Sequence, residues 1–219
     1  MGGDVVATGG SRVRLVAFDL DGTLTRGDTV VEVLAQKLGH VERMRALEAT
    51  VAERQDRASI RLLRDETAKY YRDVTITTLR SHLGSLTLAP GAREAFALFR
   101  QFHIATAIVS ITWAFAAEWI AQELGADYHV GTRLLADGSV DHFWPEDKAT
   151  WLEALMRRMG ILREEVVAIG DSWLDAPMLR AAGRAIYVGL TAPPGVCLMH
   201  VPGGDIHRIA RAIVGGAVA

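Results

Sequence analysis

Two aspartates stand one residue apart at the end of a short apolar run. The run reads VAFDLDGTL over residues 16–24, and its acids are Asp19 and Asp21. An apolar segment that stops at acidic residues indicates a buried strand with two carboxylates at its carboxyl end, where open α/β sheets bind ligands. Two like charges this close are costly unless they share a proton or hold a divalent cation. The pair is therefore the first candidate for chemistry.

Other polar residues follow apolar runs further along the chain. Ser110 and Asp171 each close such a run, Lys148 opens a segment of helical periodicity, and Asp175 lies four residues after Asp171. Because the carboxyl ends of parallel strands share one edge of a sheet, we expect these residues to meet Asp19.

This set of residue types favours phosphate chemistry. Several aspartates suit a hard cation such as Mg²⁺. A lysine and a hydroxyl suit a phosphoryl group, as a point charge and a hydrogen-bond donor. An aspartate can also be a nucleophile that forms an acyl phosphate. Since no histidine or cysteine nucleophile is evident, the residues indicate attack of a carboxylate on phosphorus.

Strands and helices must alternate to bring these residues together. Apolar runs typical of buried strands cover residues 13–18, 104–109, 128–130, 166–169 and 185–188. Helical periodicity covers residues 91–101, 113–124, 148–159 and 176–182. Asp137-Gly138 predicts a hairpin turn between 133–135 and 140–142. The alternation predicts the α/β class, with a Rossmann-like parallel sheet, right-handed crossovers and flanking helices.

Residues 29–88 interrupt this alternation. Their apolar residues recur at helical spacing, and we expect three or four helices and no strand there. Pro90-Gly91 marks the return to the core pattern. We therefore predict a flexible tail at 1–12, a catalytic core at 13–26 and 89–219, and an all-helical insert at 27–88.

Composition limits the partners and the compartment. Among 219 residues, 24 Lys and Arg against 26 Asp and Glu give a net charge of −2, which argues against nucleic acid or an anionic membrane as the main partner. One cysteine, Cys197, excludes an internal disulfide and fits a reducing cytoplasm. No apolar run reaches the ~18–20 residues of a membrane span. We expect a cytoplasmic monomer or homodimer that binds a small phosphorylated metabolite.

Four motifs in this order resemble those of the haloacid dehalogenase superfamily of phosphotransferases. They are Asp19-Leu20-Asp21-Gly22-Thr23-Leu24-Thr25, then Ser110 after Ile108-Val109, then Lys148, and then Gly170-Asp171-Ser172-Trp173-Leu174-Asp175. The resemblance covers nearly all of the chain beyond residue 12. The insert at 27–88 lies between the first and second motifs, where the phosphoserine phosphatase-like branch carries a small helical cap.

The resemblance implies roles for the acids. Asp19 would be the nucleophile. Asp21 would be the acid that protonates the leaving oxygen and then the base that activates water. Mg²⁺ would be held by the Asp19 carboxylate, the Asp21 backbone carbonyl and Asp171, while Asp175 would act directly or through water and Lys148.

The same resemblance implies the groups that bind the phosphoryl oxygens. Ser110 and Lys148 would bind these oxygens and offset charge in the transition state, and the backbone amides of Leu20 and Ile111 would assist. The presence of Asp21 favours ester hydrolysis or a phosphomutase, because dehalogenases lack this acid and the transport ATPases carry threonine there. A non-catalytic phosphometabolite binder of the same fold is the alternative outside enzymes.

The substrate-reading residues are less well defined. By the resemblance, Asp28 would hold an amino group of the leaving group, and Arg61 or Arg64 would hold a carboxylate. Asp28 is equally explained as the N-cap of a helix that begins near Thr29, and both arginines as solvated charges. The second motif reads Ser110-Ile111-Thr112-Trp113 where the branch commonly has Ser-Gly-Gly-Phe. Phosphoserine is therefore one candidate substrate.

Overall fold

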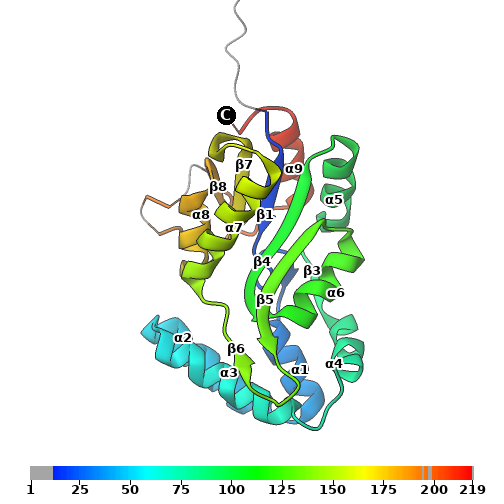
Figure 1. Cartoon of the computed structure of the whole chain (residues 1–219), viewed down its shortest axis with the longest axis vertical. Coiled ribbons are helices and arrows are strands. Elements are labelled where there is room, and N and C mark those ends of the chain that lie inside the picture. The colour runs from blue at the N-terminus through cyan, green and yellow to red at the C-terminus, as the bar shows by residue number, and fades with distance from the viewer. Residues whose placement is uncertain (1–11, 194, 197–198, 219) are drawn as a thin grey trace, which may run out of the picture.

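The computed structural model describes residues 12–193, 195–196 and 199–218. Most of the predicted tail and Cys197 lie outside the described residues. The described chain forms a sheet of seven strands in the order β6-β5-β4-β1-β7-β8-β9 (Figure 1). The strands are β1 Leu15–Phe18, β4 Ala105–Trp113, β5 Tyr128–Leu134, β6 Val140–Asp141, β7 Val166–Gly170, β8 Arg184–Tyr187 and β9 Met199–His200. Their pairings are parallel except for the β5–β6 hairpin, which confirms the predicted α/β class.

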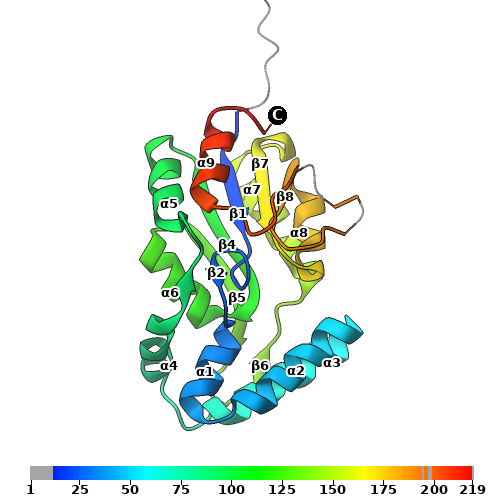
Figure 2. The same ribbon diagram turned by 180° about the vertical axis from the view of Figure 1, so that it is seen from behind.

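Helices cover both faces of this sheet. On one face lie α5 (Ala92–Gln101), α6 (Ala114–Leu124) and α9 (Ile206–Val214), and on the other lie α7 (Pro145–Met159) and α8 (Ala176–Ala181) (Figures 1 and 2). The central strand β1 is buried on both sides, because successive side chains point to opposite faces. Val16 and Phe18 join the core under α5, α6 and α9, whereas Leu15 and Ala17 join the core under α7 and α8.

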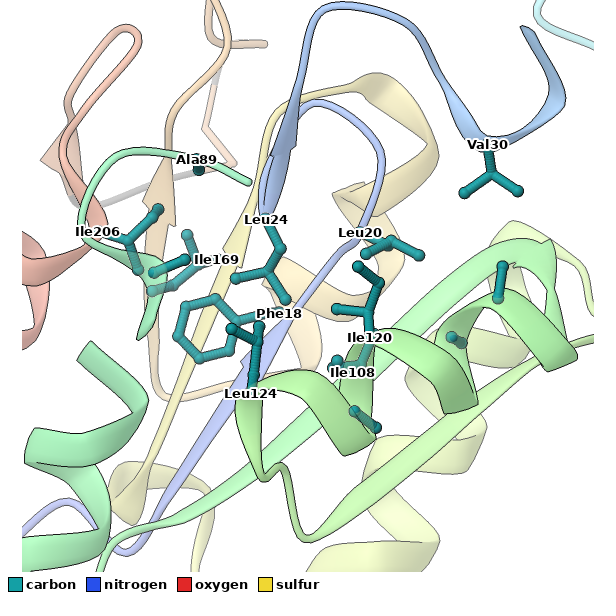
Figure 3. Packing of buried hydrophobic residues seen from close by; sticks show 14 of the residues in the cluster. Phe18, Leu20, Leu24, Val30, Ala89, Ile108, Ile120, Leu124, Ile169 and Ile206 are labelled. Atoms are coloured by element: carbon teal, nitrogen blue, oxygen red, sulfur yellow. The ribbon is translucent and has the colours of Figure 1, made fainter. Parts of the chain in front are cut away.

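Phe18 shows how this packing fixes the position of the strand. Its ring lies 5.1 Å from that of Phe96 and 6.1 Å from that of Phe99. Its side chain is fully buried and lies beside Leu24 and Leu124 (Figure 3). Burying a side chain of this size contributes about 1.5–3 kcal/mol. Asp19 follows Phe18 directly, so the anchored strand determines where its carboxylate emerges.

A layer of four helices lies beyond the carboxyl edge of the sheet (Figure 1). It consists of α1 (Val30–Leu38), α2 (Val41–Arg54), α3 (Arg57–Tyr71) and α4 (Ile76–His82), within the described residues. Thr29 caps α1 in a capping box with Glu32, and Asp56 caps α3 through the Ser59 amide. Asp28, offered by the sequence as an N-cap, is not the cap of α1.

The two chain crossings between core and helices pair with each other. β2 (Thr25–Arg26) and β3 (Thr87–Leu88) form a two-stranded antiparallel sheet, and the Ala89 amide donates to the Leu24 carbonyl at 2.8 Å. The expectation that residues 29–88 contain no strand is therefore wrong at its last two residues. The pairing closes the base of the helical layer, and two residues are too few to leave an alternating pattern in the sequence.

Other differences follow from context that periodicity does not carry. The strand expected at 104–109 continues to Trp113, and its register with β5 shifts between Val109 and Trp113. The sequence-based prediction contained neither β9 nor α9. β9 has only two residues, and its pairing with β8 is set by tertiary packing. α9 has apolar residues at helical spacing, Ile206, Ile209 and Ile213, behind the N-cap Asp205, so its signal was present in the sequence and was missed. In the part of the chain that the structure describes, no helix is both long and apolar enough to cross a bilayer.

Candidate active site

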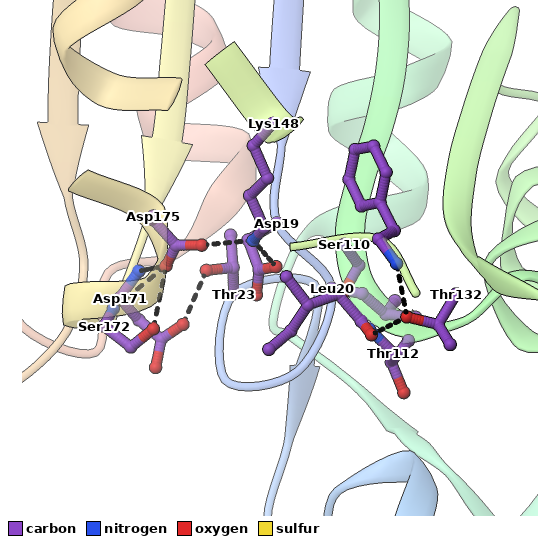
Figure 4. A network of polar contacts seen from close by, with 12 residues as sticks. Asp19, Leu20, Thr23, Ser110, Thr112, Thr132, Lys148, Asp171, Ser172 and Asp175 are labelled. Carbon is purple, nitrogen blue, oxygen red and sulfur yellow. Dashed lines mark hydrogen bonds and ion pairs between the residues drawn. The ribbon is translucent and has the colours of Figure 1, made fainter. Parts of the chain in front are cut away.

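The side chains expected to converge do so at the carboxyl edge of the sheet (Figure 4). One carboxylate oxygen from each of Asp19, Asp171 and Asp175 lies within 4.8 Å of the others. They follow β1 and β7, which are neighbours in the sheet. Chain segments separated by about 150 positions thus build one acidic centre.

Lys148 lies between two of these acids. Its Nζ is 2.6 Å from Asp19 Oδ1 and 2.5 Å from Asp175 Oδ1, and the side chain is fully buried. Burial alone would lower its pKa, but the charges of Asp175 and Asp19 outweigh burial and raise the pKa above its usual range. Lys148 stands in the first turn of α7, which starts with Pro145 at a position where proline is favoured.

Asp175 organises the loop after β7. Its Oδ2 accepts hydrogen bonds from the amides of Asp171 and Ser172, each at 3.0 Å, and from the Ser172 hydroxyl at 3.2 Å. Its Oδ1 accepts the bond from Lys148. Both oxygens are therefore engaged, so Asp175 orients its neighbours. Its side chain makes no capping bond to α8.

Asp171 is held at the opening of the site. Thr23 donates its hydroxyl to Asp171 Oδ1 at 3.1 Å. Burial and the charge of Asp175 raise the pKa of Asp171 to about 7. Gly22 passes beside it with φ +82°, and a Cβ there would lie 2.2 Å from Asp171 Oδ2. Glycine at this position therefore allows both the left-handed backbone and the close approach.

The charge balance of the centre is strongly negative. Burial, followed by the charge of Asp175, raises the pKa of Asp19 well above its ordinary value of 3.8, against the opposing charge of Lys148. Three ionised carboxylates and one ammonium leave two negative charges uncompensated. The donors are all carboxylate oxygens, which suits a hard divalent cation such as Mg²⁺. The residues present therefore fit such an ion.

Asp21 is separate from this cluster. Its Oδ1 accepts a hydrogen bond from the Val30 amide at the start of α1, at 2.8 Å. Burial raises the pKa of Asp21 to about 6, and the Val30 bond opposes that rise. Its carboxyl is thus poised to exchange a proton near neutral pH.

Ser110 reaches the same site from β4. Its side chain is buried, and its hydroxyl accepts a bond from the Thr112 amide at 3.3 Å. The carbonyl of the next residue, Ile111, accepts bonds from the Thr132 hydroxyl at 2.9 Å and from Arg64 Nη2 at 2.8 Å. These bonds lie within the segment from Val109 to Trp113, where the register of β4 with β5 shifts.

A cavity of about 270 Å³ joins the acids to the helical layer. This volume lies just below the range of about 300–1,000 Å³ that is usual for drug-sized ligands, and it suits a small metabolite. Its walls are mostly apolar, with Asp19, Asp21, Ser110 and Lys148 at one end and Glu48 and Arg64 among its polar members. The other lining residues are Thr29, Val31, Val51, Ala52, Ile60, Leu63, Ile111, Thr112, Trp113, Ser172, Trp173 and Leu174.

The three substrate-reading candidates of the helical insert have different positions. Asp28 does not line the cavity; it accepts bonds from Gln36 at 2.6 Å and Arg45 at 3.4 Å. Arg61 is exposed outside the cavity, with its guanidinium 5.8 Å from the Trp144 ring centroid. The structure therefore brings neither residue to the acids.

Arg64 does line the cavity, but it is already engaged. Nη2 donates to the carbonyls of Ile111 and Phe143, at 2.8 and 2.7 Å, and Nη1 lies 3.4 Å from His142 Nδ1. Its guanidinium also packs against the Trp144 ring. Burial lowers the pKa of Arg64 to about 9. These contacts join α3 to the loop after Ser110 and to the segment before Lys148.

Sequence analysis missed Glu48, which lies on α2 and lines the cavity. The sequence does contain a signal for Glu48, which is an acidic residue on an apolar helix face. Met44, Leu47 and Val51 form the buried face of α2, and Glu48 lies on the same face. An acid in an apolar stripe is costly unless it has a purpose. Trp113 and Trp173 also line the cavity, and Trp113 is at the same time a buried core residue that packs on Tyr71 and Phe115.

Comparison with known proteins agrees with this geometry. Residues 16–180 match the family model described as haloacid dehalogenase-like hydrolase. The chain belongs to this family. A phosphoserine phosphatase of Halobacterium salinarum is 30% identical over 83% of this chain and 88% of its own length. One from Archaeoglobus fulgidus is 26% identical over 79% of this chain, which spans only 52% of that relative.

Solved structures show the same fold. A phospho-aspartyl intermediate analogue of phosphoserine phosphatase superposes with a TM-score of 0.76 at 23% identity, covering 92% of this chain and 99% of that one. The predicted resemblance to the haloacid dehalogenase phosphatases and their phosphoserine phosphatase-like branch is confirmed by these relatives.

Proposed function

We propose that this chain is a Mg²⁺-dependent phosphomonoesterase that works through an aspartyl phosphate. The observation that carries the proposal is the buried contact of Lys148 with Asp19, beside Asp171 and at the end of a cavity that Asp21 also lines. A protein that only binds phosphate would need the groups that contact the phosphoryl oxygens. It would not need Asp21, a second acid whose pKa lies near 6.

The metal would be held by the Asp19 and Asp171 carboxylates and the Asp21 backbone carbonyl. When bound, Mg²⁺ offsets charge on the phosphoryl oxygens and on the acids around them. Asp175 would act indirectly, because both of its oxygens are used to hold Lys148 and the loop of Asp171 and Ser172.

In the first step, an oxygen of Asp19 forms a bond to phosphorus while the bond from phosphorus to the ester oxygen breaks. Asp21 gives its proton to that leaving oxygen, so the alcohol departs neutral. In the second step, Asp21 takes a proton from water as the water oxygen bonds to phosphorus. The bond from phosphorus to Asp19 then breaks, which returns Asp19 and inorganic phosphate.

Three groups would hold the phosphoryl oxygens during both steps. Lys148 would offer a fixed positive charge, Ser110 a hydroxyl, and Ile111 a backbone amide. The next peptide unit, between Ile111 and Thr112, is held by its own bonds: the Ile111 carbonyl accepts from Thr132 and Arg64, and the Thr112 amide donates to the Ser110 hydroxyl. These bonds restrain the loop that follows Ser110. Such fixed donors stabilise charge without reorganising during the reaction.

The substrate would be a small phosphorylated metabolite, phosphoserine or one similar to it. The size of the cavity and the names of the relatives support this class. The helices of residues 27–88 would act as the cap that covers the leaving group. The balanced charge and single cysteine favour action in the cytoplasm on a free metabolite, as a monomer or homodimer.

Phosphate release tests the proposal. The purified protein with Mg²⁺ should release phosphate from at least one of phosphoserine, phosphoethanolamine, sugar phosphates and an aryl phosphate, and Asp19→Asn should abolish release. The matched control is Asp137→Asn, since Asp137 lies in the turn of the β5–β6 hairpin, where it accepts bonds from the amide and the hydroxyl of Ser139. Turnover that survives Asp19→Asn or removal of Mg²⁺ by EDTA would refute the mechanism.

A further inference from the structure

The cavity extends from the phosphoryl site to the helical layer. At the phosphoryl site, Lys148 is paired with Asp19 and Asp175. Glu48 lines the same cavity from α2, a helix of that layer. A substrate that places its phosphate on Lys148 would therefore extend its leaving group toward Glu48.

Glu48 forms no ion pair among the described residues, although the charge of the nearby Arg45 acts on it and opposes the rise in its pKa. Its single hydrogen bond in the described part of the chain comes from the Thr29 hydroxyl to Oε1, at 2.6 Å. In the same described residues no lysine, arginine or histidine nitrogen lies within 4.0 Å of it; the nearby Arg45 instead pairs with Glu32 and Asp28. One oxygen of this partly buried carboxylate therefore has no donor.

Most of the residues that the helical layer contributes to the cavity are apolar. They include Val31, Val51, Ile60 and Leu63, beside the polar Glu48, Thr29 and Arg64. Such walls cannot pair with the carboxylate, and burial raises the pKa of Glu48 to about 7. A cationic group on a ligand would relieve this cost.

Arg64, which also lines the cavity, does not supply the missing cation to Glu48. Its guanidinium is directed to the Ile111 and Phe143 carbonyls and stacks on Trp144. Within the described part of the chain, Glu48 thus has neither Arg64 nor another cationic side chain in direct contact.

We propose that Glu48 binds the leaving group of the substrate. This leaving group is a short alkyl alcohol that carries an ammonium group at the end away from the phosphate. This inference rests on the proposed function, since it assigns the leaving-group end of the same cavity. It also moves the expected reader of an amino group from Asp28, at the start of the cap, to a different helix. The apolar walls would contact the short carbon chain, and Glu48 would accept a charge-assisted hydrogen bond from the ammonium.

A pair of nearly isosteric esters tests this assignment. Phosphoethanolamine and n-propyl phosphate differ mainly in a terminal ammonium against a methyl group. The kcat/KM of the wild type should be at least roughly tenfold higher for phosphoethanolamine, the size expected of one charge-assisted hydrogen bond. Glu48→Gln should remove most of this preference and leave kcat/KM for n-propyl phosphate within about twofold.

Two further variants make the test specific. Glu53→Gln removes the same charge from an exposed position of α2 and should keep the preference. Asp28→Asn should also keep it; loss of the preference in this variant and not in Glu48→Gln would overturn the assignment. So would equal kcat/KM for the two esters in the wild type, or an equal fall for both in Glu48→Gln.

Failure of the underlying function has a different signature. If the protein releases no phosphate from any ester in the presence of Mg²⁺, the phosphatase proposal is wrong. If it hydrolyses both esters without preference, the phosphatase proposal stands and the role of Glu48 is wrong. Turnover of n-propyl phosphate by Glu48→Gln also shows that this variant has folded.

Discussion

Replacing Glu48 by glutamine should stabilise the fold at alkaline pH and not at acid pH. The pKa of Glu48 rises from its ordinary value of 4.5 to about 7 on folding, first because it is buried and against the opposing bond from Thr29. The folded state therefore holds a proton on Glu48 between these pH values, whereas the unfolded chain has lost it. Stability must fall as the pH rises through this window.

The size of the effect follows from the two pKa values. At 1.36 kcal/mol for each pH unit, the full shift corresponds to roughly 3 kcal/mol. Because the side chain is only partly buried, and because ionisation of the unfolded chain has begun by pH 5, we expect about 2 kcal/mol between pH 5 and pH 8. Glutamine keeps an oxygen for the Thr29 hydroxyl, so it removes the charge with little change of shape.

Urea unfolding at a series of pH values measures this difference. The free energy of unfolding of Glu48→Gln should exceed that of the wild type by an amount that grows by about 2 kcal/mol from pH 5 to pH 8. Glu53→Gln, on the exposed side of the same helix, should give a difference that stays nearly constant. A constant difference for Glu48→Gln, or a growing loss of stability, would show that the carboxylate is not desolvated as described.

Further predictions concern the acid, the lysine and the buried arginine. Asp21→Asn should lower kcat/KM by roughly 10²–10⁴-fold for an alkyl phosphate and much less for an aryl phosphate, whose leaving oxygen needs less protonation; equal losses would exclude Asp21 as the acid. In the wild type, kcat/KM for the alkyl ester should fall as the pH rises through about 6, because Asp21 then loses its proton. Lys148→Met should cost about 3–5 kcal/mol in urea unfolding at pH 7, since it leaves Asp19 and Asp175 buried without their cation. That deficit should shrink as the pH falls and Asp19, whose pKa burial raises, is protonated; a deficit independent of pH would contradict the charge argument. Arg64→Lys should lower kcat roughly ten- to hundredfold for phosphoserine and phosphoethanolamine alike, because a single ammonium cannot hold two carbonyls in the fork geometry of arginine; a loss confined to phosphoserine would instead show that Arg64 binds a carboxylate.

The core of the fold could be predicted because its signals are local. A run such as residues 15–18 reads as a strand from four adjacent side chains, and glycines such as Gly125 and Gly160 end their helices in the left-handed conformation that the sequence indicates. The convergence of Asp19 with Asp171 also follows from sequence, since parallel strands share an edge. These predictions needed no knowledge of how one element packs on another.

The helical insert could not be read in the same way. Periodicity locates its helices, but the direction that a side chain such as Asp28 or Arg64 takes depends on which helix face meets the core. Asp28 is held by Gln36 and Arg45, both further along the chain, and Arg64 by carbonyls about 47 and 79 positions away. Pairings at such separation leave no trace in a local pattern.

Buried charges have different surroundings in the core and in the helical layer. In the core, Lys148 is held by the carboxylates of Asp19 and Asp175, and Asp175 in turn by the amides of Asp171 and Ser172, so these groups keep one geometry whatever ester is bound. In the helical layer, Glu48 is left with a single hydroxyl donor and a raised pKa. A charge that the protein does not satisfy lowers stability, and it can be satisfied only by what enters the cavity. If the proposed function holds, the end at Lys148 would therefore determine the reaction, while Glu48 would determine which phosphate ester is bound well enough to undergo it.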